Sequence, residues 1–559
     1  MKPLCKSALW KSLFSFLVAS LIPGILIGLS WRIPGFGLVG VFGLAVFFYV
    51  QASLNKFSTV FLSAMGTGTA AYLIACSWFG YTIGYLIHID RFWADILTFP
   101  VSMLQGGHYA LFAVIWLFAR RISKFGFWLA PFLWIIVQGN WPGLFPCRNG
   151  CLLLDVPNFC QIAEIGGVDL VSLFAASLSL GLTVLIFVIR SHKPEMTSAD
   201  EAMTNRMFRS QGVFYLVSLS FVAATVFLWG QHRVAELSRQ MRVIKGKPLR
   251  LLMVQANTEY KESNARMIEV SRQFKGQVDL IVWPESSLGS YNRELKDFAD
   301  AETVVKNSVG KDMQFQPFPD PAAPLLAGAS TWQPNANGQA PKSHFVSALL
   351  FDQNEQLVGR RDKVELMPYG ESIPGESLLP FLRTWMGSKE RVLQGEGTSP
   401  IGDVGDMKIG VALCCEDMSP KLVRQLVSQG ADLIMTLGNG IAFDSEVALN
   451  QHFRIAQLRA IEHRKYFVRC TSHGVSGLVD PTGKLIIELP MMIDGAAMID
   501  VPRVRLPSAA YSSNGSSVEA ALICFPVFML IGPGALRLRK RFSGREASGI
   551  QTELSTAQA

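Results

Sequence analysis

The residues with the clearest chemical potential lie in the segment 411–417, Val-Ala-Leu-Cys-Cys-Glu-Asp. Its apolar beginning is typical of a buried strand, and the strand gives way to two cysteines and two acids. A thiol at a strand end, where the backbone turns, is displayed at the mouth of a site. Because neighbouring carboxylates raise the pKa of a thiol, a nucleophilic Cys414 or Cys415 needs a cation and a base from elsewhere in the chain.

Two other segments supply those groups. Glu285 follows Trp-Pro, and the proline prevents a strand from continuing, so this carboxylate is displayed on a turn. Lys363 follows an expected hairpin, and Glu371 closes the Pro-Tyr-Gly-Glu run after it. Taken singly, Glu285 would be a solvated loop residue, Lys363 a surface lysine and Cys414 a small buried hydrophobic residue. Their conjunction at three strand ends favours a shared site.

In this order, Glu285, Lys363 and Cys414 resemble the Glu–Lys–Cys signature of the nitrilase (carbon–nitrogen hydrolase) superfamily. The apolar runs around them narrow the resemblance to its membrane branch, the apolipoprotein N-acyltransferases. The resemblance implies that Cys414 is the nucleophile that forms a thioester, that Glu285 is the general base and that Lys363 holds the oxyanion. It also implies an α-β-β-α sandwich for the catalytic domain, with no cofactor and no metal.

Three supporting positions follow from the same resemblance. Glu371 would position Lys363, Glu416 would lie in the active site, and the backbone N–H of Cys415 would help to hold the oxyanion. If the alternation of the strand continues, only one of the two cysteines can face the base and the lysine. The Cys-x-Glu match selects Cys414.

The composition points to a membrane. Half of the 559 residues are hydrophobic and 17% are charged, whereas soluble domains carry about a quarter charged residues. The net charge of +8 comes largely from Lys and Arg clusters beside apolar runs, which favours orientation in a membrane over nucleic-acid binding. No nucleic-acid motif is present, and the nine cysteines lack the spacing of a zinc site.

Eight apolar runs are long enough, or nearly so, to be predicted membrane spans: 12–30, 37–54, 58–78, 96–118, 126–140, 168–189, 212–230 and 518–536. A cleaved signal peptide is the alternative for the first run, but its length and the spans that follow favour a helix. The basic clusters at 120–124, 190–209 and 537–541 fall on one side if both termini are cytoplasmic. The soluble block would then be periplasmic.

The expected organisation has four parts: a transmembrane domain of about seven helices (1–233), a nitrilase-like domain (249–505), a C-terminal transmembrane helix (518–536) and a basic cytoplasmic tail (537–559). Short apolar runs alternate with amphipathic ones in the second part, as in an α/β sandwich. The predicted strands are 251–254, 279–283, 346–351, 357–360, 408–413, 432–437, 466–470, 476–479 and 484–488, and the predicted helices are 264–274, 418–429 and 446–462.

The resemblance implies a two-step acyl transfer in the bacterial inner membrane by an integral membrane protein, expected to be a monomer. An acyl chain would pass from a membrane phospholipid to Cys414, and then to the N-terminal amine of the diacylglyceryl-cysteine of an apolipoprotein, the final step of lipoprotein maturation. Two alternatives remain. A membrane-anchored amidase or hydrolase would use the same triad with water as acceptor. A transporter or scaffold with an inactive domain would tolerate Cys414→Ser.

Several features leave room for other interpretations. Asn439 and Phe443 match the family pattern, but Ala442 stands where the family has Trp, which leaves the lipid preference open. Residues 105–108, Gln-Gly-Gly-His, interrupt a span and serve either helix packing or a lipid-entry cleft. His452 is assigned to packing. The aromatic belts at the span ends are predicted to contain Trp78, Tyr81, Tyr85, Trp93 and Trp141.

A structural disulfide between two of the three loop cysteines, Cys147, Cys151 and Cys160, is as compatible with the sequence as free thiols.

Overall fold

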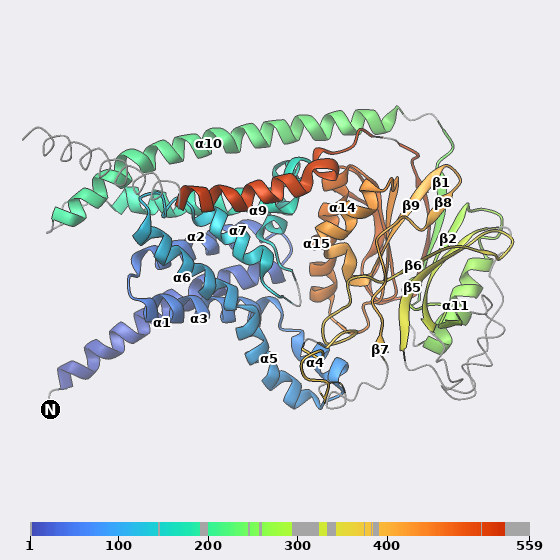
Figure 1. The fold of residues 1–559 in the computed structure, drawn as a ribbon, viewed down its shortest axis with the longest axis horizontal. Coiled ribbons are helices and arrows are strands. Elements are labelled where there is room, and N and C mark those ends of the chain that lie inside the picture. Colours follow the sequence, from blue (N-terminus) through green and yellow to red (C-terminus); the bar gives the residue numbers. More distant parts are fainter. Residues whose placement is uncertain are drawn as a thin grey trace, which may run out of the picture.

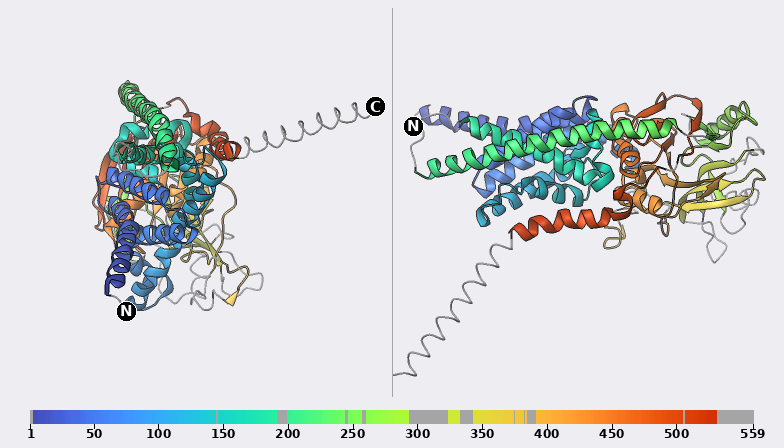
Figure 2. Two further views of the ribbon diagram at one scale, coloured as in Figure 1. Left: turned by 90° about the vertical axis from the view of Figure 1, so that its left-hand side faces the viewer. Right: turned by 90° about the horizontal axis from the view of Figure 1, so that it is seen from above.

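The computed structural model describes residues 3–143, 146–190, 199–243, 246–256, 260–292, 323–332, 343–373, 375–381, 383, 391–504 and 506–530. They form a helical bundle and an α/β domain that abuts one end of it (Figure 1). A final helix, Ala510–Leu530, runs back from the α/β domain along the bundle (Figure 2). The end of the last predicted span (531–536) and the basic tail (537–559) lie outside the described residues.

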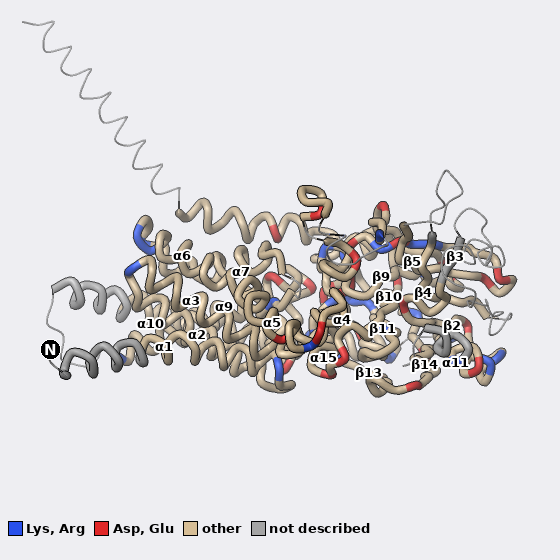
Figure 3. The backbone as a smooth tube through the Cα atoms, turned by 90° about the horizontal axis from the view of Figure 1, so that it is seen from below, with Lys and Arg blue, Asp and Glu red and all other residues tan. Residues whose placement is uncertain are grey.

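The bundle consists of α1 (Pro3–Arg32), α2 (Gly37–Ser53), α3 (Phe57–Ala75), α4 (Phe79–Ile87), α5 (Arg91–Gln105), α6 (Gly107–Ile122), α7 (Ala130–Asn140), η1 (Asn149–Asp155), α8 (Pro157–Cys160), α9 (Ala163–Arg190) and α10 (Ala199–Arg242). Charged residues are sparse along it and gather in the α/β domain and at the junction (Figure 3). The bundle therefore has the composition of a membrane domain.

Five helices in the described part of the chain are long and apolar enough to cross a membrane: Phe57–Ala75, Arg91–Ile122, Ala163–Arg190, Ser210–Arg242 and Ala510–Leu530. The apolar segments Phe16–Arg32 and Gly37–Ser53 are shorter. The count of eight spans stays a prediction.

The fourth and fifth predicted spans have different outcomes. The run 96–118 lies within Arg91–Ile122, which is long and apolar enough to cross a membrane, and the single residue Gly106 separates its two parts, α5 and α6. A Cβ at Gly106 would come within 2.4 Å of the Gly68 carbonyl carbon in α3, so the two segments approach closely there. The run 126–140 yields only the 11-residue α7, which is about half the length needed to span a bilayer.

The α/β domain is built on two sheets that the described residues form. The first has the order β14-β1-β2-β4-β5-β6, with β3 beside β4 and β7 beside β5; the second has the order β13-β12-β11-β10-β9-β8. The strands are β1 (Leu249–Gln255), β2 (Leu280–Val282), β3 (Ser290–Asn292), β4 (Leu325–Trp332), β5 (Ser343–Phe351), β6 (Leu357–Asp362), β7 (Arg391–Val392), β8 (Gly402–Val404), β9 (Met407–Leu413), β10 (Leu433–Gly438), β11 (Phe467–Thr471), β12 (Ser476–Val479), β13 (Leu485–Leu489) and β14 (Gly495–Val501).

Successive side chains of a strand point to opposite faces of its sheet, and this alternation forms the cores between the layers. In β1, Leu251 and Met253 enter the core between the two sheets, whereas Leu252 and Val254 pack toward α11 (Tyr260–Arg272). On the second sheet, α14 (Pro420–Ser428) and α15 (Glu446–His463) cover the outer face (Figure 1). The described elements therefore stack as helix, sheet, sheet, helix, which is the predicted sandwich.

The strands predicted from the sequence all form, with small differences at their ends, and 346–351 and 357–360 pair as the predicted hairpin. The predicted helix 418–429 is wrong at its beginning. A short 3-10 helix, η2 (Cys414–Met418), occupies the first positions, and α14 begins at Pro420 with Ser419 as its N-cap. Five strands of the described residues, β3, β4, β7, β8 and β14, have no predicted counterpart.

Helix α15 joins the domain to the bundle. Gln451 donates from Nε2 to the carbonyl of Ala75 (2.8 Å) and accepts from Trp78 Nε1 (3.1 Å). At the kink of α9, where Gly167 has φ +65°, the N–H of Val168 donates to Glu462 Oε1 (2.7 Å). The domain is thus held to the bundle by buried polar contacts.

Arg464, at the end of α15, makes the densest of these contacts. Its fully buried guanidinium donates to Glu164 Oε2 (2.5 Å), Gln161 Oε1 (2.7 Å) and the Pro481 carbonyl (2.8 Å). Glu164 also pairs with Arg233 of α10 (3.0 Å). Arg464 therefore connects the α8–α9 segment to a hairpin of the α/β domain, and Glu164 extends the connection to α10.

We expect Arg464→Gln to lower the melting temperature of the purified protein by several degrees, because breaking a buried ion pair costs about 3 kcal/mol or more. Arg250→Gln is the matched control, since the Arg250–Asp500 pair is exposed and screened by water, so its loss should leave the melting temperature almost unchanged. Thermal unfolding in one detergent measures both. Equal melting temperatures for the two variants would contradict the assigned role of Arg464.

Candidate active site

Three strand ends bring the predicted residues together. Glu285 follows β2, Lys363 follows β6 and Cys414 follows β9. The Lys363 Nζ lies 3.1 Å from Glu285 Oε1 and 2.7 Å from Glu371 Oε1. The side chain of Lys363 is only 1% exposed, so an ammonium group is held out of water between two carboxylates. Such a buried charge is tolerated only when it is paired and hydrogen-bonded.

The backbone that carries Glu285 depends on a glycine in the neighbouring strand. Gly328 of β4 donates to the Pro284 carbonyl (3.1 Å), and a Cβ at Gly328 would come within 2.5 Å of the Glu285 Cα. Only a residue without a side chain permits this approach. No local pattern in the sequence indicates this contact, because Gly328 lies far from Glu285 along the chain.

Cys414 occupies a turn and not the continuation of a strand. Its φ is +48°, which is uncommon for a residue other than glycine, and η2 begins there. Its buried thiol hydrogen-bonds with Glu285 and lies 3.7 Å from the Asn439 carbonyl. The thiol of Cys415 donates instead to the Glu365 carbonyl (3.6 Å). The predicted choice of Cys414 agrees with this geometry, but the assumption of continued alternation is wrong.

Burial and the neighbouring charges keep the Cys414 thiol neutral beside the Glu285 carboxylate. Burial raises the pKa of Glu285 to about 6, the charge of Lys363 opposes that rise and the charge of Glu371 adds to it. Burial, together with the negative charge of Glu285, raises the pKa of Cys414 to about 12. Burial also disfavours the charged form of Lys363, but the two carboxylates outweigh it and raise its pKa well above the usual value. Near neutral pH, Glu285 and Lys363 are therefore charged and Cys414 keeps its proton.

Glu371 is fixed by a tight turn. Its Oε2 accepts from the backbone N–H of Met367 (2.7 Å), and its own N–H donates to the Met367 carbonyl (2.9 Å). Tyr369 takes a positive φ of 65° inside this turn. With one carboxylate oxygen on the backbone and the other on Lys363, Glu371 sets the position of the ammonium group.

Glu416 lies beneath the turn that carries Cys414, and its side chain is completely buried. It accepts from the backbone N–H groups of Leu413 (2.8 Å) and Val364 (2.6 Å) and from the Arg361 guanidinium (2.6 Å). None of its described hydrogen bonds goes to the base, the lysine or the thiol. Glu416 therefore ties the turn that carries the cysteine to the segment that carries the lysine.

His452 belongs to a neighbouring buried network. Its Nε2 lies 2.7 Å from Asp417 Oδ1, and Arg469 Nε donates to Asp417 Oδ2 (3.0 Å). Burial alone would raise the pKa of Asp417, but His452 and Arg469 outweigh it and lower that pKa. The contact supports the end of η2, in line with the structural role predicted for His452.

An apolar cavity of about 260 Å³ opens beside the two cysteines. Helices α4 and α5 of the bundle form one wall, and Met418 and Phe443 of the catalytic domain lie on the other side. Trp78 packs edge-on against Phe443, with 5.3 Å between the ring centroids. The cavity thus connects the thiol to the membrane part of the chain.

The cavity was not predicted as such. Trp78 was assigned to an aromatic belt, yet it lines this space, and so does Gln105 of the polar interruption in the fourth predicted span. His108 is buried in the bundle, with Nδ1 2.9 Å from the Gln105 carbonyl. The only available signal was the clustering of polar and aromatic residues near span ends.

The three loop cysteines form no disulfide with one another. Cys147, Cys151 and Cys160 are free thiols, and Cys147 hydrogen-bonds with the thiol of Cys76, a residue that the sequence did not associate with this loop. Within the described ranges, no three metal-binding side chains gather in one place.

Two family models match the chain. The model "Apolipoprotein N-acyltransferase N-terminal domain" matches residues 23–181, and the model "Carbon-nitrogen hydrolase" matches residues 250–511. The bundle and the α/β domain each correspond to one of them, in the order in which they occur here.

Curated relatives and solved structures extend the comparison. An apolipoprotein N-acyltransferase of Bdellovibrio bacteriovorus is 22% identical, over 94% of this chain and 95% of the relative. Those of Geobacter metallireducens and Pseudomonas syringae pv. tomato are 25% and 24% identical, over 83% and 75% of this chain and 85% and 72% of the relatives. A crystal structure of an amidase from Nesterenkonia sp. matches 50% of this chain and 97% of its own at 15% identity, with a TM-score of 0.34. From the two models and the full-length relatives, the chain belongs to the apolipoprotein N-acyltransferase family.

Proposed function

We propose that this protein transfers an acyl chain from a membrane phospholipid to the N-terminal amine of the diacylglyceryl-cysteine of apolipoproteins. The observation that carries the proposal is the apolar cavity between Cys414 and helices α4 and α5. A hydrolase of small soluble amides has no need of an apolar cavity walled by membrane helices. A long acyl chain, by contrast, would lie in such a cavity with its carbonyl carbon at the thiol.

In the first half-reaction, Glu285 takes the proton of the Cys414 thiol as the sulfur attacks the ester carbonyl of the phospholipid. Lys363 and the backbone N–H of Cys415 stabilise the oxyanion of the tetrahedral intermediate. The intermediate collapses to a thioester, and Glu285 returns the proton to the leaving oxygen of the lysophospholipid.

In the second half-reaction, the amine of the lipoprotein cysteine attacks the thioester. Glu285 accepts a proton from the attacking nitrogen and delivers it to the departing sulfur of Cys414, which leaves an amide and a free thiol. An apolar cavity favours this outcome, because it lowers the access of water to the thioester. The scheme predicts ping-pong kinetics.

The supporting residues act through the triad. Glu371 holds the Lys363 ammonium, while Glu416 joins the turn of Cys414 to the segment of Lys363. We further place the protein in the bacterial inner membrane as a monomer with eight spans, with both termini in the cytoplasm and the catalytic domain in the periplasm. The charge distribution along the apolar runs supports this orientation.

The acyl-enzyme gives the most direct test. After incubation with a phospholipid, we expect intact-mass analysis to find a fatty-acyl adduct on the wild-type protein and on Cys415→Ala, but none on Cys414→Ala. A diacylglyceryl-cysteine peptide should discharge the adduct. An adduct that only water removes would indicate a lipid hydrolase, and the absence of any adduct would refute the thioester mechanism.

The rate of acylation should depend on the ionisation of Glu285. Because the base must be deprotonated to take the thiol proton, the rate is expected to fall as the pH drops through about 6. Glu371→Gln removes a negative charge that raises the pKa of Glu285, so the acid limb should move to lower pH. Single-turnover rates between pH 4.5 and pH 8 measure both profiles, and an acid limb that stays in place in Glu371→Gln would contradict this electrostatic assignment.

Filling the cavity should separate long from short acyl donors. Val101 of α5 lines the cavity, and we expect Val101→Trp to slow acylation by a long-chain phospholipid roughly tenfold or more, by occluding the space for the chain. Acylation by a short activated ester should change little, because Glu285, Lys363 and Cys414 are untouched. Leu111→Trp, on the exposed face of α6, is the control. Equal losses with both donors would show that the chain does not occupy this cavity.

A further inference from the structure

We propose that Cys76 and Cys147 form a disulfide bond that fixes the end of α3 to the loop between α7 and η1. In the structure both residues are thiols, and the thiol of Cys147 hydrogen-bonds with that of Cys76. The two positions are far apart in the sequence, so only the packing of the bundle brings them together. The bond is separate from the chemistry of acyl transfer, because neither cysteine lines the acyl cavity.

Two further features place the thiols side by side. Cys147 lines a cavity of about 10 Å³ together with Tyr72 and Ala75 of α3, the helix that ends one residue before Cys76. A cavity of this size holds at most one water molecule, so the loop packs directly against α3. Both cysteines also lie beside the Tyr72 side chain, and Cys76 is completely buried.

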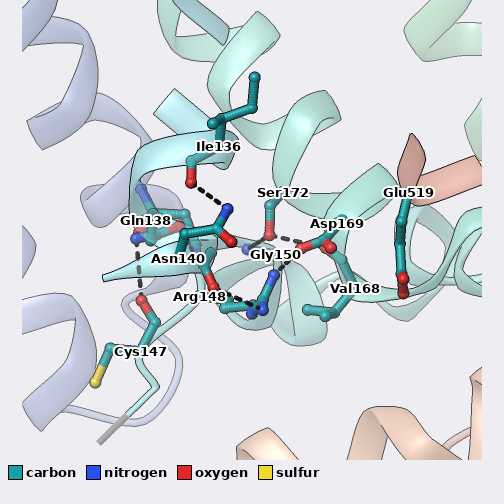
Figure 4. Close-up of polar contacts among 12 residues, drawn as sticks. Ile136, Gln138, Asn140, Cys147, Arg148, Gly150, Val168, Asp169, Ser172 and Glu519 are labelled. Atoms are coloured by element: carbon teal, nitrogen blue, oxygen red, sulfur yellow. Dashed lines mark hydrogen bonds and ion pairs between the residues drawn. The ribbon is translucent and has the colours of Figure 1, made fainter. Parts of the chain in front are cut away.

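Polar contacts hold the backbone of the loop that carries Cys147. Gln138 of α7 donates from Nε2 to the carbonyl of Cys147 (3.0 Å), and its Oε1 accepts from the N–H of Asn149 (3.2 Å). Arg148 pairs with Asp169 of α9, and the Cys147 side chain points away from this pair (Figure 4). The loop is therefore fixed by its polar neighbours, while the thiol is left to face the end of α3.

Cys76 is held equally well in the turn between α3 and α4. Its N–H donates to the Tyr72 carbonyl (2.8 Å), and its own carbonyl accepts from the N–H of Phe79 (2.9 Å). The preceding residue, Ala75, accepts a hydrogen bond from Gln451 of the catalytic domain (2.8 Å). Because a disulfide tolerates little error in the placement of its two residues, a pair with both backbones held is suited to form one.

Neither the other loop cysteines nor a metal ion accounts for the pair as well. Cys151 affects the ionisation of Cys160 through its charge, and Cys147 affects that of Cys151 in the same way. The thiol hydrogen bond of Cys147, however, goes to Cys76. A metal ion would need further ligands, and no three potential ligands gather anywhere in the described part of the chain. Cys76 and Cys147 are therefore the pair that oxidation would join.

The bond requires an oxidant. Each thiol loses a proton, the two sulfurs join, and two electrons pass to a disulfide-containing oxidant, which is released as two thiols. The periplasm supplies such oxidants, so this step rests on the periplasmic placement under the proposed function. The hydrogen bond with Cys76, together with burial, raises the pKa of Cys147 well above its usual value. Because the thiolate is the exchanging species, the bond must form before the loop packs on α3.

The bond would anchor part of the wall of the acyl cavity. Trp78 and Phe79, which follow Cys76 closely, both line that cavity. A covalent link from Cys76 to the loop after α7 would hold the start of α4 in place and would restrict the unfolded chain, which stabilises the folded protein.

The test uses the full chain, extracted from its host membrane into detergent with a maleimide present to block free thiols. After denaturation, reduction should expose two further thiols in the wild-type protein and in Cys151→Ala, but none in Cys76→Ala or Cys147→Ala. Intact-mass analysis counts these thiols. Peptide mapping of the unreduced wild-type protein should recover a cross-linked peptide that contains Cys76 and Cys147.

Melting temperatures give an independent measurement. Cys76→Ala should lower the melting temperature by several degrees, because the cross-link no longer restricts the unfolded chain. Cys151→Ala removes an equally buried sulfur without a cross-link and should lower it less. Cys147→Ala should behave like Cys76→Ala, and the double variant should fall no further than either one. Additive losses would show that the two thiols contribute independently and would overturn the disulfide.

The remaining outcomes are equally decisive. A cross-linked peptide that joins Cys147 to Cys151, or the absence of any reducible bond in the wild-type protein, would overturn the pairing. Mapping of the wild-type protein needs no substitution, so the test holds even where a variant fails to fold. The acyl adduct on Cys414, measured in the same sample, reports separately on the proposed function. An adduct without the disulfide would refute only the pairing, and a disulfide without an adduct would refute only the thioester mechanism.

Discussion

The pairing of one buried ammonium group with two carboxylates is the interaction on which the catalytic centre depends. Lys363 is almost inaccessible to water, so its charge is stable only while Glu285 and Glu371 remain within hydrogen-bond distance. This requirement holds three separate segments, after β2, after β6 and in the following turn, at fixed positions. Cys414, the proposed nucleophile, belongs to a fourth segment, and Glu416 holds the turn of that segment through backbone hydrogen bonds.

The same pairing sets the reactivity of the site. Each carboxylate stabilises the charge of Lys363, and Lys363 in turn keeps the pKa of Glu285 close to the physiological range in spite of burial. A thiol in such surroundings stays protonated until a substrate carbonyl arrives, because Glu285 and the apolar cavity both disfavour the thiolate. In the proposed mechanism, the thiolate therefore forms only at the moment of attack, and the resting Cys414 thiol is a poor nucleophile for other electrophiles.

Much of this centre could be predicted, because strand ends are local features of the sequence. The apolar runs before Glu285, Lys363 and Cys414 predict strands, and three strand ends at one edge of a sandwich bring such residues together. Strand β4 was missed because its small residues, among them Gly328, give a weak strand signal. The sequence alone could not reveal why position 328 requires a glycine. The reason is that the backbone of Glu285 packs directly against it.

The cavity and the junction were beyond prediction for a different reason. They depend on which bundle helices face the catalytic domain, and neither the apolar pattern of α4 and α5 nor the spacing of Arg464 and Glu164 specifies that packing. Likewise, no local pattern encodes the close approach of Gly106 to Gly68 in α3. Periodicity identifies the elements, whereas their mutual placement depends on contacts between residues far apart in the chain.

The return of the chain to the bundle after β14 restricts how the enzyme can open. The catalytic domain leaves the bundle at the end of α10 and rejoins it through Ala510–Leu530, and α15 is fastened between these two connections by Gln451 and Arg464. A domain anchored at both ends and in the middle cannot swing outward as a lid. The remaining wall of the cavity beside Cys414 is formed by α4 and α5 of the bundle. In mechanical terms, the catalytic domain is the fixed frame of this enclosure, and any change in the width of its opening must come from these two helices.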